Sequence, residues 1–225
     1  MIVSMSMKEI IICDDVRKRF PDLRAFLILI KDVHIENTLK NLEEFKKDVF
    51  DDVKRRYSLH ELKDVAIFRA YRDFFWEIGV DPTKTRPASE ALIRRILQGK
   101  QIPSVNTLVD AYNLASIVSE VPLAAFDYQT LQGELLMRFA QQDGEFVGIG
   151  MKEVKLKGNE IVISDSKKVI AIYPHRDSDE TKITTETKDV LLMVCGAPGV
   201  GEDILNKARD IAVGYIRRFC GGQVV

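Results

Sequence analysis

The chain has 225 residues, of which 46% are hydrophobic and 30% charged, and its formal net charge is −1. This balance excludes a disordered chain, and the near-zero charge excludes a protein that binds nucleic acid through a broadly basic surface. The chain has three cysteines but no CxxC pair, so we expect no disulfides, metal or cofactor. It has no apolar run of the ~18 residues that span a membrane and no secretory signal, so we expect a cytoplasmic protein.

The N-terminal region is predicted to contain strands followed by helices. Residues 9–12 form a short apolar segment, and the continuous apolar run 25–30 is typical of a strand that is covered on both faces. An apolar repeat at three and four residues predicts a helix over 35–53. The capping-box sequence at 58–61 predicts that a second helix begins there and runs to Trp76, which we expect in the core.

The rest of the chain changes from helical to strand periodicity. A third helix follows Pro87, and a fourth is predicted over 105–118, after Pro103. Short segments rich in Val, Ile and Phe then alternate with turn residues, and a final helix is predicted over 202–219. The short segments predict a mostly antiparallel sheet; they are residues 134–140, 146–149, 154–157, 159–163, 169–173, 181–184 and 190–194.

This order of elements predicts an α+β fold. Helices cluster early and strands late, so we expect a helix-rich N-terminal half packed on the sheet in a single compact domain. The apolar run 25–30 can bury both faces only by joining that sheet.

The helix over 105–118 carries a polar stripe. Asn106, Asp110 and Asn113 are spaced at i, i+4 and i+7, so their amides and carboxylate lie on one side and can bind a polar molecule. Tertiary hydrogen bonds that tie the helix to the sheet are the alternative interpretation.

Several linked motifs resemble the B3/B4 domain of the phenylalanyl-tRNA synthetase β subunit. Residues 105–113 (VNTLVDAYN) are similar to the helix S-N-V-V-D-V-T-N-Y of that family, and residues 121–127 (VPLAAFD) resemble Q-P-M-H-A-F-D. The next motifs of that family read D-L-D-K-L-x-G…V-R-x-A…G-E. This chain has similar residues in the same order: 131–133, the strand with Arg138, and 144–146.

The resemblance implies a B3/B4-like domain over residues 1–225. Its core is residues 86–196, preceded by strands and helices in 1–80 and followed by the helix 202–219. In the synthetase this domain inspects and hydrolyses mischarged tRNA. At the position of the histidine in M-H-A-F-D, however, this chain has Ala124. A methyl group cannot orient a water molecule, so hydrolysis here requires other groups, and loss of activity is the alternative.

A second candidate site is the polar run 173–181. Arg176 can bind a carboxylate or phosphate with two hydrogen bonds, Asp177 can bind an ammonium group, and Ser178 and Thr181 supply hydroxyls. A solvated hairpin loop is the alternative. The run also contains His175 and Asp179, but no spacing signature supports a metal site.

A third group of cations surrounds residues 81–87, DPTKTRP. Arg72, Lys84 and Arg86 lie near a predicted helix start, where a phosphate or carboxylate can bind. Stand-alone members of the B3/B4 family resemble this segment, and a simple helix start is the alternative. The pair Arg94–Arg95 is interpreted as a solvated face.

The resemblance implies a tRNA-binding protein of translational quality control. The hypothesis is that it recognises the aminoacyl end of a tRNA and hydrolyses a mischarged ester in trans, with a positioned water as the nucleophile. A non-catalytic module that binds a free amino acid, or a similar small zwitterion, is the alternative. The candidate substrate-binding residues are Asn106, Asp110, Asn113, Arg176, Asp177, Ser178, Thr181 and Arg86.

Overall fold

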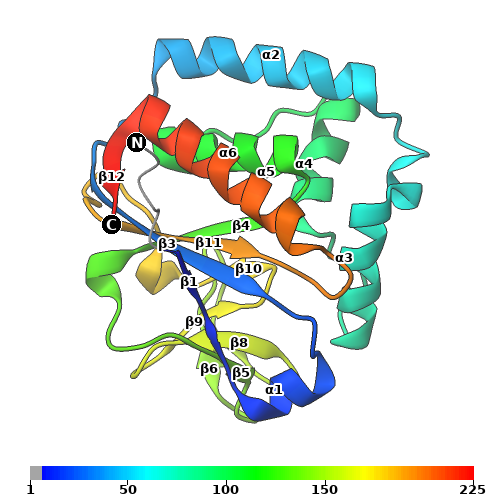
Figure 1. Cartoon of the computed structure of the whole chain (residues 1–225), viewed down its shortest axis with the longest axis vertical. Helices are drawn as coiled ribbons and strands as arrows, with labels where there is room; N and C mark the ends of the chain where they lie inside the picture. Colours follow the sequence, from blue (N-terminus) through cyan, green and yellow to red (C-terminus); the bar gives the residue numbers. More distant parts are fainter. Residues whose placement is uncertain (1–6) are drawn as a thin grey trace.

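The computed structural model describes residues 7–225 and confirms the α+β fold (Figure 1). Helices cover one face of a central sheet, and a second sheet covers the other face. The central sheet contains, in spatial order, β1 (Met7–Glu9), β3 (Ala25–Val33), β11 (Val190–Cys195) and β4 (Leu123–Asp127), and β12 (Gly221–Val224) also pairs with β3.

The N-terminal strand β3 is an integral part of this sheet. It pairs antiparallel with β11, with Ile28 opposite Leu192, and β11 pairs antiparallel with β4. Every residue of β11 is buried, as is typical of an apolar strand that has covered faces. The prediction that the run 25–30 joins the C-terminal sheet is therefore confirmed.

The second sheet brings the polar run 173–181 close to the central sheet. Its strands are antiparallel except for the pair β2–β5, and a separate hairpin joins β6 (Glu145–Phe146) to β7 (Val154–Lys155). Its spatial order is β10 (Arg176–Asp177), β9 (Val169–Ile172), β8 (Ile161–Ser164), β5 (Leu136–Phe139) and β2 (Ile11–Ile12).

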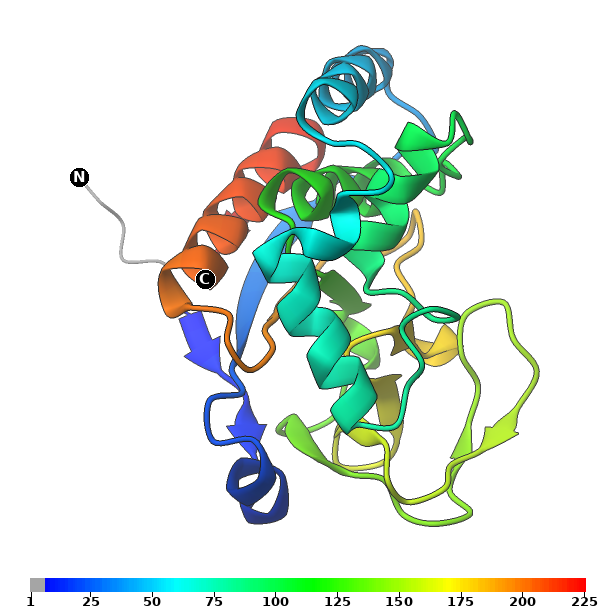
Figure 2. The ribbon, with the colours of Figure 1, turned by 90° about the vertical axis from the view of Figure 1, so that its right-hand side faces the viewer.

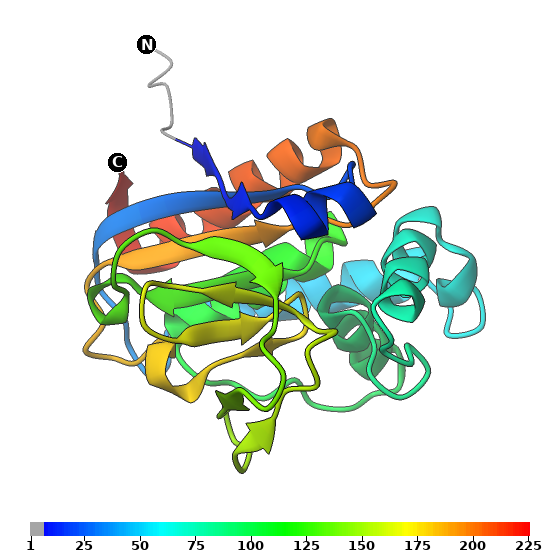
Figure 3. The same cartoon turned by 90° about the horizontal axis from the view of Figure 1, so that it is seen from below.

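Two helices, α5 (Thr107–Ser119) and α6 (Glu202–Cys220), pack against each other and cover the central sheet. The helices α2 (Lys40–Arg56) and α4 (Ala88–Leu97) form an outer layer over α5, and α3 (Ala66–Glu77) runs along one side (Figure 2). The short α1 (Asp14–Arg19) packs against β5 on the lower side of the molecule, which faces the viewer in Figure 3. Among the described residues no helix combines the length and apolar composition needed to cross a membrane.

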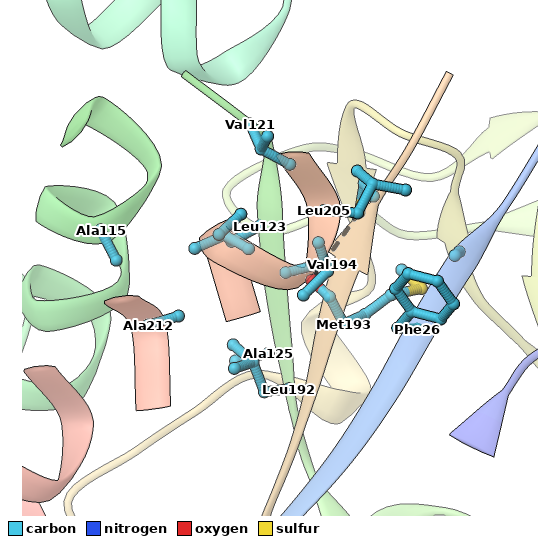
Figure 4. Close-up of a cluster of buried hydrophobic side chains, with 14 of the residues drawn as sticks. Phe26, Ala115, Val121, Leu123, Ala125, Leu192, Met193, Val194, Leu205 and Ala212 are labelled. Carbon is cyan, nitrogen blue, oxygen red and sulfur yellow. Dashed lines mark hydrogen bonds between the residues drawn. The ribbon is translucent and has the colours of Figure 1, made fainter. Parts of the chain in front are cut away.

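The core between the helices and the central sheet is built from small and branched side chains. Leu123 and Ala125 of β4 lie beside Leu192 and Val194 of β11, and Ala115 of α5 with Leu205 and Ala212 of α6 close the cluster (Figure 4). Because side chains alternate along a strand, the residues between them, Ala124 and Met193, face the second sheet. The larger of two core clusters in the described residues extends from Ile10 to Cys220, which supports the proposal of a single domain.

Three local predictions were wrong. Residues 58–64 form turns and the 3₁₀ helix Leu62–Asp64 instead of the start of α3. Residues 181–184 form no strand, because the Ser178 hydroxyl accepts a hydrogen bond from the Glu180 N–H and caps the 3₁₀ helix Asp179–Thr181. Trp76 is 57% exposed, since Phe74 and Phe75 occupy the buried side of α3. A further 3₁₀ turn covers Tyr128–Thr130.

Candidate functional site

The two sheets and two helices meet around a cavity of about 160 Å³, which we call the junction pocket. It is smaller than the roughly 300–1,000 Å³ of sites that hold drug-sized molecules, so it can admit only a small group. The central sheet contributes Ala124, Met193 and Cys195, and helix α4 contributes Ala88 at its first turn. The polar lining comes from α5 and from the chain after β9: Tyr112, Asn113, Tyr173, His175, Arg176 and Asp177.

Strand geometry explains why these side chains converge. Ala124 and Met193 are cross-strand partners, so both face the second sheet. In that second sheet Asp177 pairs with Ala171, which places the edge strand β10 beside the pocket. The turn from β9 to β10 contains a cis peptide bond between Tyr173 and Pro174.

Two buried tyrosines hold the end of β11 in place. The Tyr71 hydroxyl donates a hydrogen bond of 2.7 Å to the Cys195 carbonyl, and the Tyr173 hydroxyl donates one of 2.7 Å to the Gly196 carbonyl. A side chain at position 196 would bring its Cβ within 2.3 Å of the Arg24 carbonyl, so only glycine fits there. This part of the pocket wall is therefore fixed by the fold.

Polar side chains of the pocket are free to bind a ligand, Asn113, Arg176 and Asp177 among them. Across residues 7–225, neither the Asn113 amide, the Arg176 guanidinium nor the Asp177 carboxylate has a hydrogen-bond or ion-pair partner. Polar groups in a partly buried site normally have partners. An amide, a cation and a carboxyl group in one small cavity therefore favour a polar ligand.

The interior of the pocket changes the ionisation of its side chains. Burial raises the pKa of Asp177 to about 7, although the nearby Arg176 acts in the opposite direction. Burial and the Arg176 charge lower the pKa of His175 to about 4, so its imidazole is neutral at pH 7. Burial, with Asp177 nearby, raises the pKa of the Cys195 thiol, which makes it a poor nucleophile.

This arrangement provides a base, a cation and a neutral hydrogen-bonding surface. A carboxyl group with a pKa near 7 is well matched to accept and return a proton at neutral pH. A guanidinium can bind a phosphate, a carboxylate or an oxygen that gains negative charge in a reaction. The apolar side chains of Ala88, Ala124 and Met193 complete the cavity.

Asn106 lies outside the junction pocket and begins helix α5. Its side-chain oxygen accepts a hydrogen bond of 2.9 Å from the Val109 N–H, and its side-chain nitrogen donates to the Ile183 carbonyl at 3.4 Å. The contacts favour the tertiary-tie interpretation for this residue, and ligand binding by Asn106 stays a prediction.

Replacing Asn106 by alanine is expected to destabilise the protein by about 1 kcal/mol, because the N-terminal cap of α5 is removed. Ligand binding should change little, since the side chain does not line the pocket. Thermal unfolding and a binding assay on the same preparation measure both effects. A variant with full stability and no binding would contradict this interpretation.

Asp110 is also engaged within the protein. The Lys46 ammonium lies 2.7 Å from its carboxylate, the Val105 N–H donates to it at 3.1 Å, and the Ser104 hydroxyl donates to it as well. Lys46, Ser104 and Asp110 line a separate cavity of about 420 Å³, which also reaches Asn113. Of the polar stripe on α5, the structure therefore brings only Asn113 to the junction pocket.

The two hydroxyl groups of the polar run are buried away from the pocket lining. Ser178 accepts the capping hydrogen bond from Glu180 at 3.3 Å. The Thr181 hydroxyl is fully buried and has no hydrogen-bond partner in the described chain. Neither residue lines the junction pocket, and their roles in ligand binding stay predictions.

The structure separates the three cations of the third group. Arg72 forms a short ion pair of 2.6 Å with the buried Glu90, between α3 and α4. Lys84 and Arg86 line a different cleft, next to Arg94 and Arg95. That cleft and the junction pocket lie along the same helix, because Ala88 lines the pocket and Ala91 lines the cleft.

Sequence reasoning missed several pocket residues. Tyr112 was not among the predicted site residues, and His175 was considered only as a metal ligand. No group of three metal-binding side chains occurs in the described part of the chain. The alternation of β11 could have indicated Met193 and Cys195, because both lie on the face opposite Leu192 and Val194.

Comparison with known proteins gives a family and a fold. The family model described as the B3/4 domain matches residues 70–221. The phenylalanine–tRNA ligase β subunit of Vibrio cholerae is 33% identical over 91 residues, which cover 40% of this chain and 11% of that protein. The same subunit from Francisella tularensis is 26% identical over 151 residues, 57% of this chain and 19% of that protein.

A solved structure shares the fold. An N-terminal fragment of the phenylalanyl-tRNA synthetase β subunit from Pyrococcus horikoshii matches with a TM-score of 0.54 and 12% sequence identity. The match covers 96% of this chain and 49% of that chain, so it includes the N-terminal region that precedes the family match.

Proposed function

The chain belongs to the B3/4 domain family, and on this basis we propose that it binds the aminoacyl end of a tRNA and hydrolyses the ester bond there. The observation that carries the proposal is the set of partner-free groups in the junction pocket, Asn113, Arg176 and Asp177. The pocket is the right size for the aminoacyl group, and a carboxyl group with a pKa of about 7 is a suitable base.

The relatives support a connection with tRNA but not a ligase activity. They are β subunits of phenylalanine–tRNA ligase, and this chain spans only about a tenth to a fifth of their length. A chain that matches only this region of the ligase subunit can still act on an aminoacyl-tRNA that a ligase has already produced. Since its substrate belongs to translation, we place the protein in the cytoplasm.

In the proposed reaction a water molecule between Asp177 and the ester is the nucleophile. The Asp177 carboxylate accepts a proton as the water oxygen attacks the carbonyl carbon of the ester. The bond from that carbon to the ribose oxygen then breaks, and the proton passes from Asp177 to the ribose oxygen. The products are a free amino acid and a tRNA with its terminal hydroxyl restored.

Arg176 and Asn113 have binding roles in this scheme. The guanidinium stabilises the negative charge that develops on the carbonyl oxygen, and the Asn113 amide binds the amino group. Asn113 lies on α5, whose position is fixed by the Asn106 cap and the Asp110 contacts. Of the polar stripe on α5, Asn113 therefore lines the pocket, whereas Asn106 and Asp110 support the helix.

Ala124 occupies the position at which the resembling synthetase motif has a histidine. It lines the junction pocket, so the position of the missing histidine borders the same cavity as Asp177. A small residue there leaves room for the substrate side chain or for the attacking water. We propose that Asp177 supplies the proton-accepting group in place of that imidazole.

Binding of a free amino acid is the rival function, and the absence of a histidine at position 124 favours it. In that case Arg176 binds the carboxylate and Asp177 binds the ammonium group of the zwitterion. Incubating the purified protein with a panel of mischarged tRNAs separates the two functions. Release of amino acid supports hydrolysis, whereas amino-acid binding without release supports the rival.

Replacing Arg176 by alanine is expected to weaken ligand binding and to slow deacylation by about 10- to 100-fold. The reason is that a hydrogen bond to a charged group contributes roughly 1.5–3 kcal/mol. Initial rates with a mischarged tRNA and thermal unfolding curves test this. The melting temperature should stay within a few degrees, because Arg176 has no ion-pair partner among residues 7–225.

Lys182→Ala is the matched control for Arg176→Ala, because it also removes one positive charge from this segment. Lys182 lies in the same region but forms an exposed ion pair of 2.8 Å with Asp179. Its replacement should leave the rate unchanged. If Arg176→Ala reacts like the wild type, the run 173–181 is a solvated loop and the proposed site is wrong.

A further inference from the structure

We propose that a basic cleft along helix α4 binds the sugar-phosphate backbone of the RNA whose aminoacyl end enters the junction pocket. The proposal rests on the proposed function for its ligand, but its charge and geometry are independent of the pocket chemistry. The cleft has a volume of about 390 Å³. Its charged lining residues are all cations: Lys84, Arg86, Arg94, Arg95 and Lys100.

This local excess of positive charge contrasts with the net charge of −1 for the whole chain. Only Lys84 has a carboxylate within ion-pair distance, Asp81 at 3.7 Å, when all residues from 7 to 225 are considered. The guanidinium groups of Arg94 and Arg95 donate to the backbone carbonyls of Leu59 and Gln101. Such contacts orient the two groups and leave their charge uncompensated.

Arg86 adds a second indication that an acceptor belongs in the cleft. Its Nε is buried and has no hydrogen-bond partner within the described chain. A buried donor without a partner costs about 1–3 kcal/mol, and a phosphate oxygen in the cleft would accept from it. Together with the charge surplus, this favours an anionic ligand.

The helix dipole explains only part of the cluster. Arg94 and Arg95 occupy the last turn of α4, where cations are favourable. Lys84 and Arg86, however, precede the helix, and Lys100 follows it. Five cations in one cleft repel one another, so stabilisation of the helix end does not account for the whole arrangement.

The position of the cleft favours a nucleic acid over an isolated anion. Ala88 lines the junction pocket and Ala91 lines the basic cleft, which is about 4.5 Å further along the helix axis. The whole of α4 is about 15 Å long, enough for more than one backbone phosphate. An RNA whose 3′ end occupies the pocket therefore continues directly into the cleft.

The test compares Lys84→Gln/Lys100→Gln with a charge-matched control. Both lysines are exposed, and the Lys84 side chain is 84% exposed, so folding should be unaffected. The control is Lys18→Gln/Lys207→Gln, which removes two exposed positive charges elsewhere. We expect the cleft variant to bind uncharged tRNA more weakly than the control, with a salt slope that is smaller by about 0.7–0.9 for each phosphate that the variant no longer neutralises.

A second arm uses an aminoacyl-adenosine, which contains the ester but lacks the preceding phosphates. The cleft variant should hydrolyse it at the wild-type rate while losing affinity for tRNA. Equal salt slopes for the cleft variant and the control would overturn the proposal, even if deacylation is normal. If the wild type hydrolyses neither substrate but its tRNA affinity depends on Lys84 and Lys100, the cleft stands and the proposed hydrolysis fails.

Discussion

Replacing Asp177 by asparagine is expected to lower the deacylation rate by about 10²- to 10⁴-fold, the contribution typical of a general base. Asparagine has nearly the same shape but cannot accept a proton from water. Because the Asp177 carboxylate has no hydrogen-bond or ion-pair partner within residues 7–225, its removal breaks no internal hydrogen bond or ion pair. Steady-state rates should show a lower kcat with little change in KM.

The pH dependence tests the same assignment. Since burial raises the pKa of Asp177 to about 7, the catalytically active carboxylate is the minor form at pH 6 and the major form at pH 8. The wild-type rate should therefore rise with pH through about 7 and then level off, and this step should disappear in the asparagine variant. A rate that does not change between pH 6 and 8 would exclude Asp177 as the base.

Stability should change in the opposite direction. A raised pKa in the folded state means that the folded protein holds this proton more tightly than the unfolded chain does. The free energy of unfolding is therefore expected to fall as pH rises from about 4 to 7. At pH 8 the asparagine variant should be more stable than the wild type, because it has no buried negative charge at this position.

Asp179→Asn is the matched control for this variant. Asp179 is two residues away and forms an ion pair with Lys182 in which both side chains are more than 40% exposed. We expect the control to keep the wild-type rate and pH profile. If Asp177→Asn raises KM and leaves kcat unchanged, Asp177 binds the ammonium group of the ligand, as in the rival function.

Periodicity was enough to predict the architecture. The apolar run at 25–30 and the segment 190–194 became the paired central strands β3 and β11, because a fully apolar strand must be covered on both faces. The acidic start and basic end of α6 likewise predicted its position well. Strand periodicity and charged helix ends are local patterns, so they can be read from a single sequence.

Long-range contacts decided which polar residues reach the site. Asp110 and Asn113 lie on the same polar stripe of the helix and were both predicted to bind ligand. The Asp110 carboxylate, however, accepts a hydrogen bond from Lys46, which is 64 positions away in the sequence. The raised pKa of Asp177 depends on burial, which no local pattern displays. The sequence singled out residues 105–113 and 173–181 as candidate binding segments, and only the structure could show which of their side chains meet.

Helix α4 connects the two proposed binding regions, so its anchoring bears on both. Its first turn borders the junction pocket, and its last turn borders the basic cleft. Between them, Glu90 is fully buried and accepts hydrogen bonds of 2.8 and 2.6 Å from the Arg72 guanidinium. This bidentate ion pair holds α4 against α3, at a point where neither ligand is expected to bind.

Replacing Glu90 by glutamine is expected to destabilise the protein by about 3 kcal/mol, because the Arg72 charge, only 19% exposed, loses its partner. For a chain of this size that corresponds to a melting temperature about 6–12 °C lower. Thermal unfolding measures the change. Asp64→Asn is the control near the start of α3, where Asp64 and Arg69 form an exposed pair at 3.7 Å, worth at most about 1 kcal/mol.

A double replacement separates the effect of charge pairing from the effect of packing. Breaking a buried ion pair leaves an uncompensated charge, whereas replacing both members by apolar residues of similar size is often neutral. Glu90→Leu combined with Arg72→Met should therefore recover most of the stability that Glu90→Gln loses. Equal melting temperatures for Glu90→Gln and Asp64→Asn would show that the pair contributes little and that packing alone positions α4.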